Sequence, residues 1–298
     1  MLFLAGIEKL PRERLLDLLT FLDGPGVTTY MTDNVTKFVN NILPSNWQTK
    51  SRSLEDSLEK KRQELDKFKD EHLRIELKNW FSKSSGVSKE DFDDPEIIAR
   101  ACLQKTAETL GMKGNFKDVK GLERVIVERY MRNIGDKIEE IMLQMEPDNL
   151  DKFPDRFREE LNKYSFIDTE HLLSQIDFKG STSKSISDSI KKTLIAGAGI
   201  GLIKSMGFSA FIMLSSAIAS AGGLIGITLP FFVYTGASSI LSFLLGPAGF
   251  GLIFMGLGSQ SIWKANERIL RERMLLAIIV MHAFMIESSQ ENKLLQRN

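Results

Sequence analysis

The chain has a single cysteine, Cys102, among its 298 residues. One thiol cannot form a disulfide within the chain, so the fold depends on packing alone, as in most proteins of a reducing cytoplasm. Histidine is almost as sparse, and none of the three histidines occurs in an HExxH motif or at another spacing that suits zinc. We therefore expect no metal ion and no cofactor.

The chain also lacks a net charge, because 39 basic residues balance 39 acidic ones. A balanced protein has no general attraction to polyanions, so nucleic acid is not expected as a partner. The N-terminal stretch MLFLAGIEKL has no basic region and reaches Glu8 and Lys9 too early for the apolar part of a signal peptide. Any entry into a membrane would therefore use an internal segment.

Charged residues and histidine are absent from residue 205 to residue 263, although 26% of the whole chain is charged. A bilayer crossing needs about 20 apolar residues, so this uncharged segment has room for two helices comfortably or for three tightly. Gly222-Gly223 and Gly246-Pro247 divide it into arms at 205–221 and 224–245 and a last stretch at 248–263. We predict a helical hairpin, whose last stretch lies at the membrane interface or docks on the rest of the chain.

Basic residues flank the uncharged segment on both sides. Because such residues stay on the side of the membrane from which a helix enters, two basic ends favour two crossings over three. The flanking residues are Lys191, Lys192 and Lys204 before the segment and Lys264, Arg268, Arg271 and Arg273 after it.

Small residues recur four positions apart in and around the hairpin. On a helix this spacing makes a flat face that another backbone can approach closely, which is typical of helix pairs in lipid. A buried helix outside the membrane uses small residues in the same way, and the sequence leaves both interpretations open. The residues are Gly197, Gly201, Ser205, Gly222, Gly226, Ser238, Ser242 and Gly246.

The rest of the chain indicates an all-α fold, since sustained alternation of apolar and polar residues is missing before residue 180. One long amphipathic helix is expected from Leu54 to Phe81. Another should start at the cap Asp94 with Pro95 and stop at Gly111. Further helices are expected at 10–23, 121–145, 151–164 and 168–176, and the buried face at 121–145 should consist of Val125, Ile126, Met131, Ile134, Ile138 and Ile141 or Met142.

The predicted architecture is an amphipathic helical bundle followed by a Gly/Ser-rich hydrophobic helical hairpin. We place a soluble helical domain at residues 1–180, a membrane-inserting hydrophobic hairpin at 181–263 and a basic-then-apolar helix at 264–298. The apolar run from Met274 to Ile286 in the last helix is too short to cross a bilayer, so a packed or interfacial helix is favoured.

No active site is recognisable in the sequence. The GAGIG stretch at 197–201 lacks the spacing and the lysine of a phosphate-binding loop, and the carboxylates lie among lysines on charged helix faces. The histidines are expected to be solvated or to cap helices, and Cys102 to be a buried thiol on an apolar helix face. The sequence therefore predicts a protein that is not an enzyme, although acids assembled from separate helices would escape a linear search.

Three stretches of the chain resemble the YaaW-like proteins, a family of uncharacterised bacterial proteins. They are LFLAGIEKLPRERLLDLLTFLDG, LQKTAETLGMKGNFKDVKGLERVIVERYMRNIGDKIEEIM and LLGPAGFGLIFMGLG. The resemblance implies a helical bacterial protein with an apolar C-terminal region, and it brings no catalytic residues.

These patterns support two hypotheses. In the first, a non-enzymatic bacterial protein passes from a soluble cytoplasmic form to the inner membrane and inserts residues 193–263, with membrane lipid as its partner; a toxin-type or defence-type effector is the sharper form. In the second, a soluble helical scaffold or chaperone-like binding protein buries the same hairpin as its core. Both hypotheses are compatible with a homo-oligomer and with an unidentified protein partner.

Overall fold

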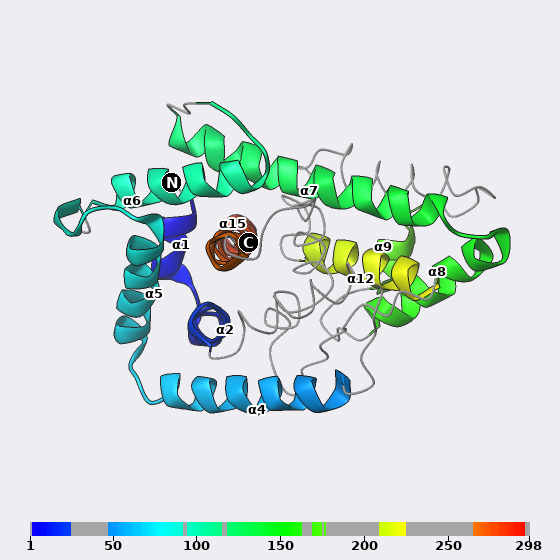
Figure 1. Ribbon diagram of the computed structural model, residues 1–298, viewed down its shortest axis with the longest axis horizontal. Coiled ribbons are helices and arrows are strands. Elements are labelled where there is room, and N and C mark those ends of the chain that lie inside the picture. The colour runs from blue at the N-terminus through cyan, green and yellow to red at the C-terminus, as the bar shows by residue number, and fades with distance from the viewer. Residues whose placement is uncertain are drawn as a thin grey trace.

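The computed structural model of the chain is all-α over the residues that it describes (Figure 1). These residues are 2–24, 47–91, 94–114, 118–162, 169–174 with 176, 209–224 and 265–295. No strand occurs among them, which confirms the predicted fold class at this level. The helices are α1 (Leu2–Lys9), α2 (Arg12–Asp23), α4 (Trp47–Leu65), α5 (Asp70–Ser85), the short 3₁₀ turn η1 (Lys89–Asp91), α6 (Pro95–Thr109), α7 (Val119–Leu143), α8 (Pro147–Leu161), α9 (Thr169–Ser174), α12 (Ser209–Leu224) and α15 (Ala265–Leu295).

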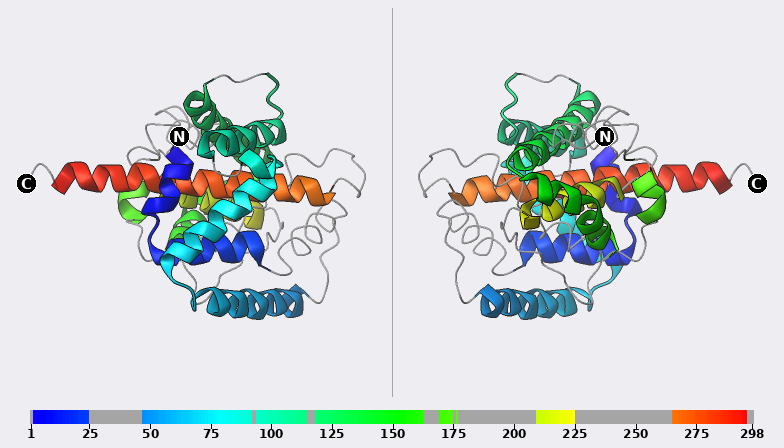
Figure 2. Two further views of the ribbon diagram at one scale, coloured as in Figure 1. Left: turned by 90° about the vertical axis from the view of Figure 1, so that its left-hand side faces the viewer. Right: turned by 90° about the vertical axis from the view of Figure 1, so that its right-hand side faces the viewer.

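The C-terminal helix α15 lies at the centre of a group of helices formed by α1, α2, α5 and α6 (Figure 1). The side views show α15 along its length, with its last turns extending beyond its neighbours (Figure 2). The long helix α7 packs on α6 at one end and on α12 in a second group that also contains α8 and α9. Helix α4 packs on α2 at the outside of the first group.

The helix predicted at 10–23 is confirmed as α2, which ends before Gly24. Helix α1 was not predicted from its sequence. It is stabilised by its neighbours, because Phe3 and Ile7 are fully buried one turn apart and α1 packs on α15. Gly6 permits this approach, since a Cβ at that position would lie only 2.9 Å from the Cγ of Met285.

The prediction of one continuous helix from Leu54 to Phe81 is wrong, because the chain forms two helices there, α4 and α5. The apolar pattern changes register near Phe68, and the two helices pack in different places, α4 on α2 and α5 on α1, α2 and α6. The tertiary contacts therefore turn a change of register into a break of the helix.

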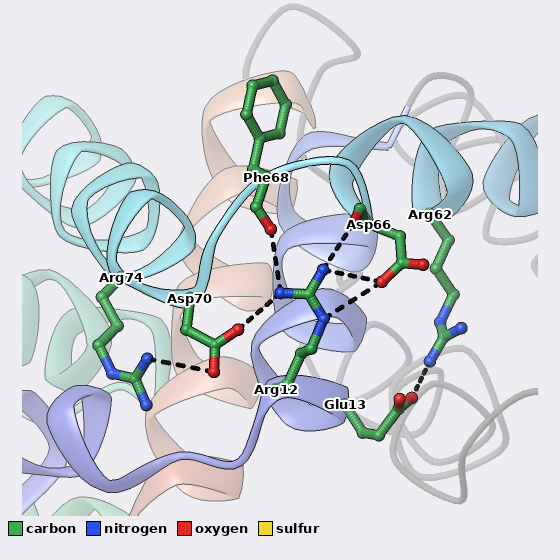
Figure 3. Close-up of polar contacts among 7 residues, drawn as sticks. All are labelled: Arg12, Glu13, Arg62, Asp66, Phe68, Asp70 and Arg74. Carbon is green, nitrogen blue, oxygen red and sulfur yellow. Dashed lines mark hydrogen bonds and ion pairs between the residues drawn. The ribbon is translucent and has the colours of Figure 1, made fainter.

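The guanidinium of Arg12 holds the break in place (Figure 3). It donates to the backbone carbonyls of Asp66 at 2.5 Å and Phe68 at 3.0 Å, and to the carboxylates of Asp66 at 2.9 Å and Asp70 at 2.6 Å. In a continuous helix those two carbonyls would accept from the amides four residues later, so Arg12 replaces the lost backbone donors. The hydrogen bonds to the two carboxylates also raise the pKa of Arg12, with that to Asp70 contributing most.

The start and the end of α6 agree with the sequence. The carboxylate of Asp94 accepts from the amides of Glu96 at 2.8 Å and Ile97 at 3.2 Å, and Pro95 occupies the first turn. Gly111 follows the helix at a φ of 69°, a left-handed conformation that suits glycine and ends a helix.

The predicted buried face of α7 is largely confirmed. Its residues Ile126, Met131, Ile134, Ile138 and Met142 are fully buried, and Ile141 nearly so. Val125 is a wrong assignment, because 43% of its surface is exposed. The helix packs on α6 and α12 along a stripe that passes through position 126, and Val125 points about 100° away from it.

The predicted hairpin is described only in its first arm. That arm, placed at 205–221, overlaps α12, but the predicted division at Gly222-Gly223 is wrong, because the helix continues through both glycines to Leu224. The second arm and the stretch at 248–263 lie outside the described residues. The C-terminal helix placed at 264–298 corresponds to α15, and its run from Met274 to Ala283 is buried, in agreement with the packed helix that the sequence favoured.

Candidate functional site

The first helix of the uncharged segment, α12, is buried against α7 and α8. On α8 the aromatic rings of Phe153 and Phe157 stack at 5.7 Å, and both side chains are fully buried. This part of α8 is amphipathic, since Asp155, Arg156 and Glu159 on its other side are exposed. Helices α7 and α8 thus offer an apolar surface to α12 and a charged surface to water. The buried apolar residues of α12 are Ile212, Met213, Ala217, Ile218, Ala219 and Ala221.

Serines are the polar side chains buried in α12. The hydroxyl of Ser220 donates to the carbonyl of Ser216 at 2.6 Å, four residues earlier in the same helix. A hydroxyl that bonds to its own helix needs no partner from the surroundings, so it is tolerated in a protein core and in hydrocarbon alike. The composition of α12 therefore suits both environments.

Helix α15 is the second sheltered helix. Every residue from Glu272 to Ala283 is buried, so the stretch is covered on all sides. Helices α1 and α6 make its most extensive described contacts, and α2 and α5 also pack on it (Figure 1). A helix covered on all sides is typical of the centre of a bundle.

Arg273 attaches α15 to the end of α2. Its guanidinium is buried and donates to the backbone carbonyls of Phe21, at 2.5 Å, and Leu22, and it lies 5.6 Å from the centre of the Phe21 ring. These carbonyls belong to the last turn of α2, where a cation also interacts well with the helix dipole. Burial lowers the pKa of Arg273 to about 10, and the carboxylate of Asp23 acts against that shift.

A buried pair of ionisable side chains connects α7 with α15. The Nδ1 atom of His282 lies 2.7 Å from the Oε1 atom of Glu123. Only 6% of the His282 side chain and 1% of the Glu123 side chain are exposed. The prediction that His282 is solvated or caps a helix is therefore wrong. The histidine lies in the buried apolar part of α15, and such a site demands a hydrogen-bonding partner.

The residues predicted to pair and flank membrane helices are only partly described. Gly222 lies within α12 and is buried. Arg268 lies in α15, the guanidinium of Arg271 binds the carboxylate of Glu108 on α6 at 2.6 Å, and Arg273 binds the last turn of α2. The other predicted positions, Gly197, Gly201, Ser205, Gly226, Ser238, Ser242, Gly246, Lys191, Lys192, Lys204 and Lys264, lie outside the described residues.

Groups that could perform chemistry are sparse in the part of the chain that the structure describes. No cluster of three or more His, Cys, Asp or Glu side chains there could hold a metal ion. His72 is exposed as predicted, with its ring stacked 4.5 Å from that of Phe68. Arg12, Asp66 and Asp70 form a cluster of paired, partly exposed charges at the break between α4 and α5, which we call the Arg12 cluster. Its charges hold the break in place, and we assign them a structural role.

Cys102 is buried between α5 and α6, as the sequence predicts, and its thiol donates to the carbonyl of Phe81 at 3.6 Å. Burial raises the pKa of this thiol from 9.0 to about 12, while Lys105 opposes the shift. Since the thiolate is the reactive form, the native thiol is a poor nucleophile.

We expect Cys102 to react with a thiol reagent about a thousandfold more slowly in the native chain than in the unfolded chain at pH 8. The raised pKa keeps the thiol protonated below pH 9, and the stability that this contributes is lost as the pH rises toward 12. The ratio of the two reaction rates is measured by the absorbance of the thiolate that a coloured disulfide reagent releases, with and without denaturant. Equal rates would show that the α5–α6 interface is open.

None of the helices described by the structure is both long enough and apolar enough to span a bilayer. No protein-family model, curated protein or solved structure matches the chain.

The buried contacts of Glu123 and Arg273 were missed by the sequence analysis. One pattern pointed to them, because His282 interrupts an apolar run and Arg273 stands directly before it. A polar residue inside such a run needs a buried partner, but periodicity does not say where that partner lies.

Proposed function

We propose that this chain is a non-enzymatic bacterial protein that inserts its uncharged segment into the inner membrane from the cytoplasmic side, and that its amphipathic helices shelter the segment beforehand. The burial of α12 against α7 and α8 carries this proposal. A helix without charged side chains loses little on passing from a protein interior to hydrocarbon, because neither offers water to the helix.

The proposal retains a hairpin within the uncharged segment, with α12 in its first arm, and the basic flanks as its membrane-inserting part. Membrane lipid is the partner, and insertion as a homo-oligomer or with another protein is compatible with it. The bacterial source rests on the resemblance to YaaW-like proteins. A toxin-type or defence-type effector that perturbs the membrane is the narrower form of this function.

A second candidate is a helical scaffold or chaperone-like binding protein in which the uncharged segment is permanent core. The burial of α15 from Glu272 to Ala283 and its attachment to α2 through Arg273 favour this alternative, because they provide a stable centre without lipid.

Flotation with vesicles separates the two candidates. The chain, purified without detergent, is mixed with vesicles of phosphatidylcholine and phosphatidylserine and then washed with alkaline carbonate, which removes peripheral proteins. We expect part of the protein to stay with the vesicles. If the protein remains monomeric and ignores anionic vesicles at every pH and salt concentration tried, the membrane proposal fails and the scaffold remains.

A further inference from the structure

Two large apolar side chains are exposed on one side of α5 and the turn before it. Phe68 is 45% exposed and Ile75 is 47% exposed. The ring of Phe68 stacks on that of His72, and Ile75 follows His72 by three residues, so all three lie on one side. The Phe68 ring projects away from the Arg12 cluster (Figure 3). We call Lys67, Phe68, Lys69, His72 and Ile75 the turn surface.

The two lysines of the turn surface make it locally basic. Lys67 and Lys69 are exposed on either side of Phe68, and neither forms an ion pair with a described residue. The adjacent carboxylates of Asp66 and Asp70 are balanced by two guanidinium groups: Arg12 lies 2.9 Å from Asp66 and 2.6 Å from Asp70, and Arg74 lies 3.9 Å from Asp70. Glu71 is exposed nearby and opposes this charge. Over residues 47–69, which include α4, seven basic residues outnumber five acidic ones.

Arg12 also fixes the orientation of the turn surface. Because its guanidinium occupies the carbonyls of Asp66 and Phe68, the polar backbone of the turn faces inward and the Phe68 ring faces outward. A side chain that is already held in place loses little conformational entropy when it binds.

From these features we infer that the turn surface is a contact site for an anionic lipid bilayer. An aromatic ring between lysines suits the boundary of such a bilayer, where the ring enters the apolar layer and the ammonium groups reach the phosphates. Each lysine near an anionic surface strengthens binding about fivefold. The inference rests on the proposed membrane association. It adds that the turn surface is the part of the protein that touches the bilayer first, and this contact does not require any helix to leave its place in the fold.

Binding of the full chain to sucrose-loaded vesicles tests the inference. With vesicles of phosphatidylcholine and phosphatidylserine at low salt, we expect Phe68→Ser to lower the partition coefficient about tenfold. The double variant Lys67→Glu/Lys69→Glu should lower it at least about thirtyfold, and Glu71→Gln should raise it about fivefold. Vesicles of phosphatidylcholine alone should bind the unchanged chain weakly.

Matched substitutions elsewhere on the surface are the controls. Val125→Ser removes an apolar side chain of similar exposure, and Lys113→Glu/Lys120→Glu reverses two exposed lysines near the start of α7. If the turn variants bind like these controls while the unchanged chain binds and inserts, the inference is overturned and the proposed function stands. If the turn variants lose binding but α12 never enters lipid, the proposed function fails and the inference stands. If the unchanged chain binds no vesicles, both fail.

Discussion

Replacing Glu123 by alanine is expected to lower the free energy of unfolding by about 1–3 kcal/mol, the cost of removing a hydrogen-bonding partner from a buried polar group. The substitution leaves His282 buried in α15 without the carboxylate that lies 2.7 Å away. Urea unfolding followed by circular dichroism measures the loss. The exposed Glu64 provides the control, since Glu64→Ala should change the same free energy by less than about 0.5 kcal/mol.

The double variant Glu123→Leu/His282→Leu distinguishes the pair from simple packing. Replacing both members of a buried polar pair with apolar side chains is often close to neutral, so this variant should recover much of the stability lost in Glu123→Ala. If Glu123→Ala behaves like Glu64→Ala, the contact between α7 and α15 does not contribute to the fold as described.

Replacing Ile218 by lysine is expected to have the second large effect, loss of the α12 docking and of membrane insertion together. Ile218 is 2% exposed, so an ammonium buried there would lose its hydration at a large cost in free energy. A charge in the middle of an inserting helix is also costly in hydrocarbon, by about 3 kcal/mol or more. Carbonate-resistant flotation should therefore fall to background.

The reactivity of Cys102 shows how far the damage from Ile218→Lys spreads. The thiol lies between α5 and α6, in the group of helices around α15, whereas α12 packs on α7 and α8. If α12 is a separable insertion helix, Cys102 stays protected in the variant. If α12 is permanent core of a single unit, Cys102 becomes reactive. Val125→Lys, at an exposed position of α7, should change neither readout.

Local patterns predicted most of the described helices, with the exception of α1 and of the break between α4 and α5. The cap of α6 at Asp94 and its end at Gly111 follow from short-range chemistry, and they occur as expected. The break between α4 and α5 depends on Arg12, which lies 54 residues before Asp66, and periodicity alone does not contain that contact. The exposure of Val125 has a similar cause, because the position of neighbouring helices decides which edge of an apolar stripe is covered.

The candidate site was predictable in composition but not in its contacts. The absence of charge from residue 205 to residue 263 identified α12 as a helix that must be covered by protein or lipid. The structure adds that α7 and α8 cover it. The two buried attachments of α15 join residues 159 apart, for Glu123 and His282, and 251 apart, for Leu22 and Arg273. Contacts between such distant residues are determined by tertiary packing, and the pattern of residues along the sequence does not contain them.

The transfer of α12 from its protein shelter into lipid is tested most directly by a fluorophore on α12. Gly223 is exposed, and among the described residues a Cβ there would meet the Nε atom of Arg156 alone, at 4.0 Å, so Gly223→Cys should fold normally and take the label. Cys102 is buried and should stay unlabelled. With vesicles of phosphatidylcholine and phosphatidylserine that carry a quencher on their acyl chains, we expect the emission to be quenched, whereas the same protein in buffer stays bright. Emission that acyl-chain quenchers never reduce, while the protein remains folded, would contradict the account.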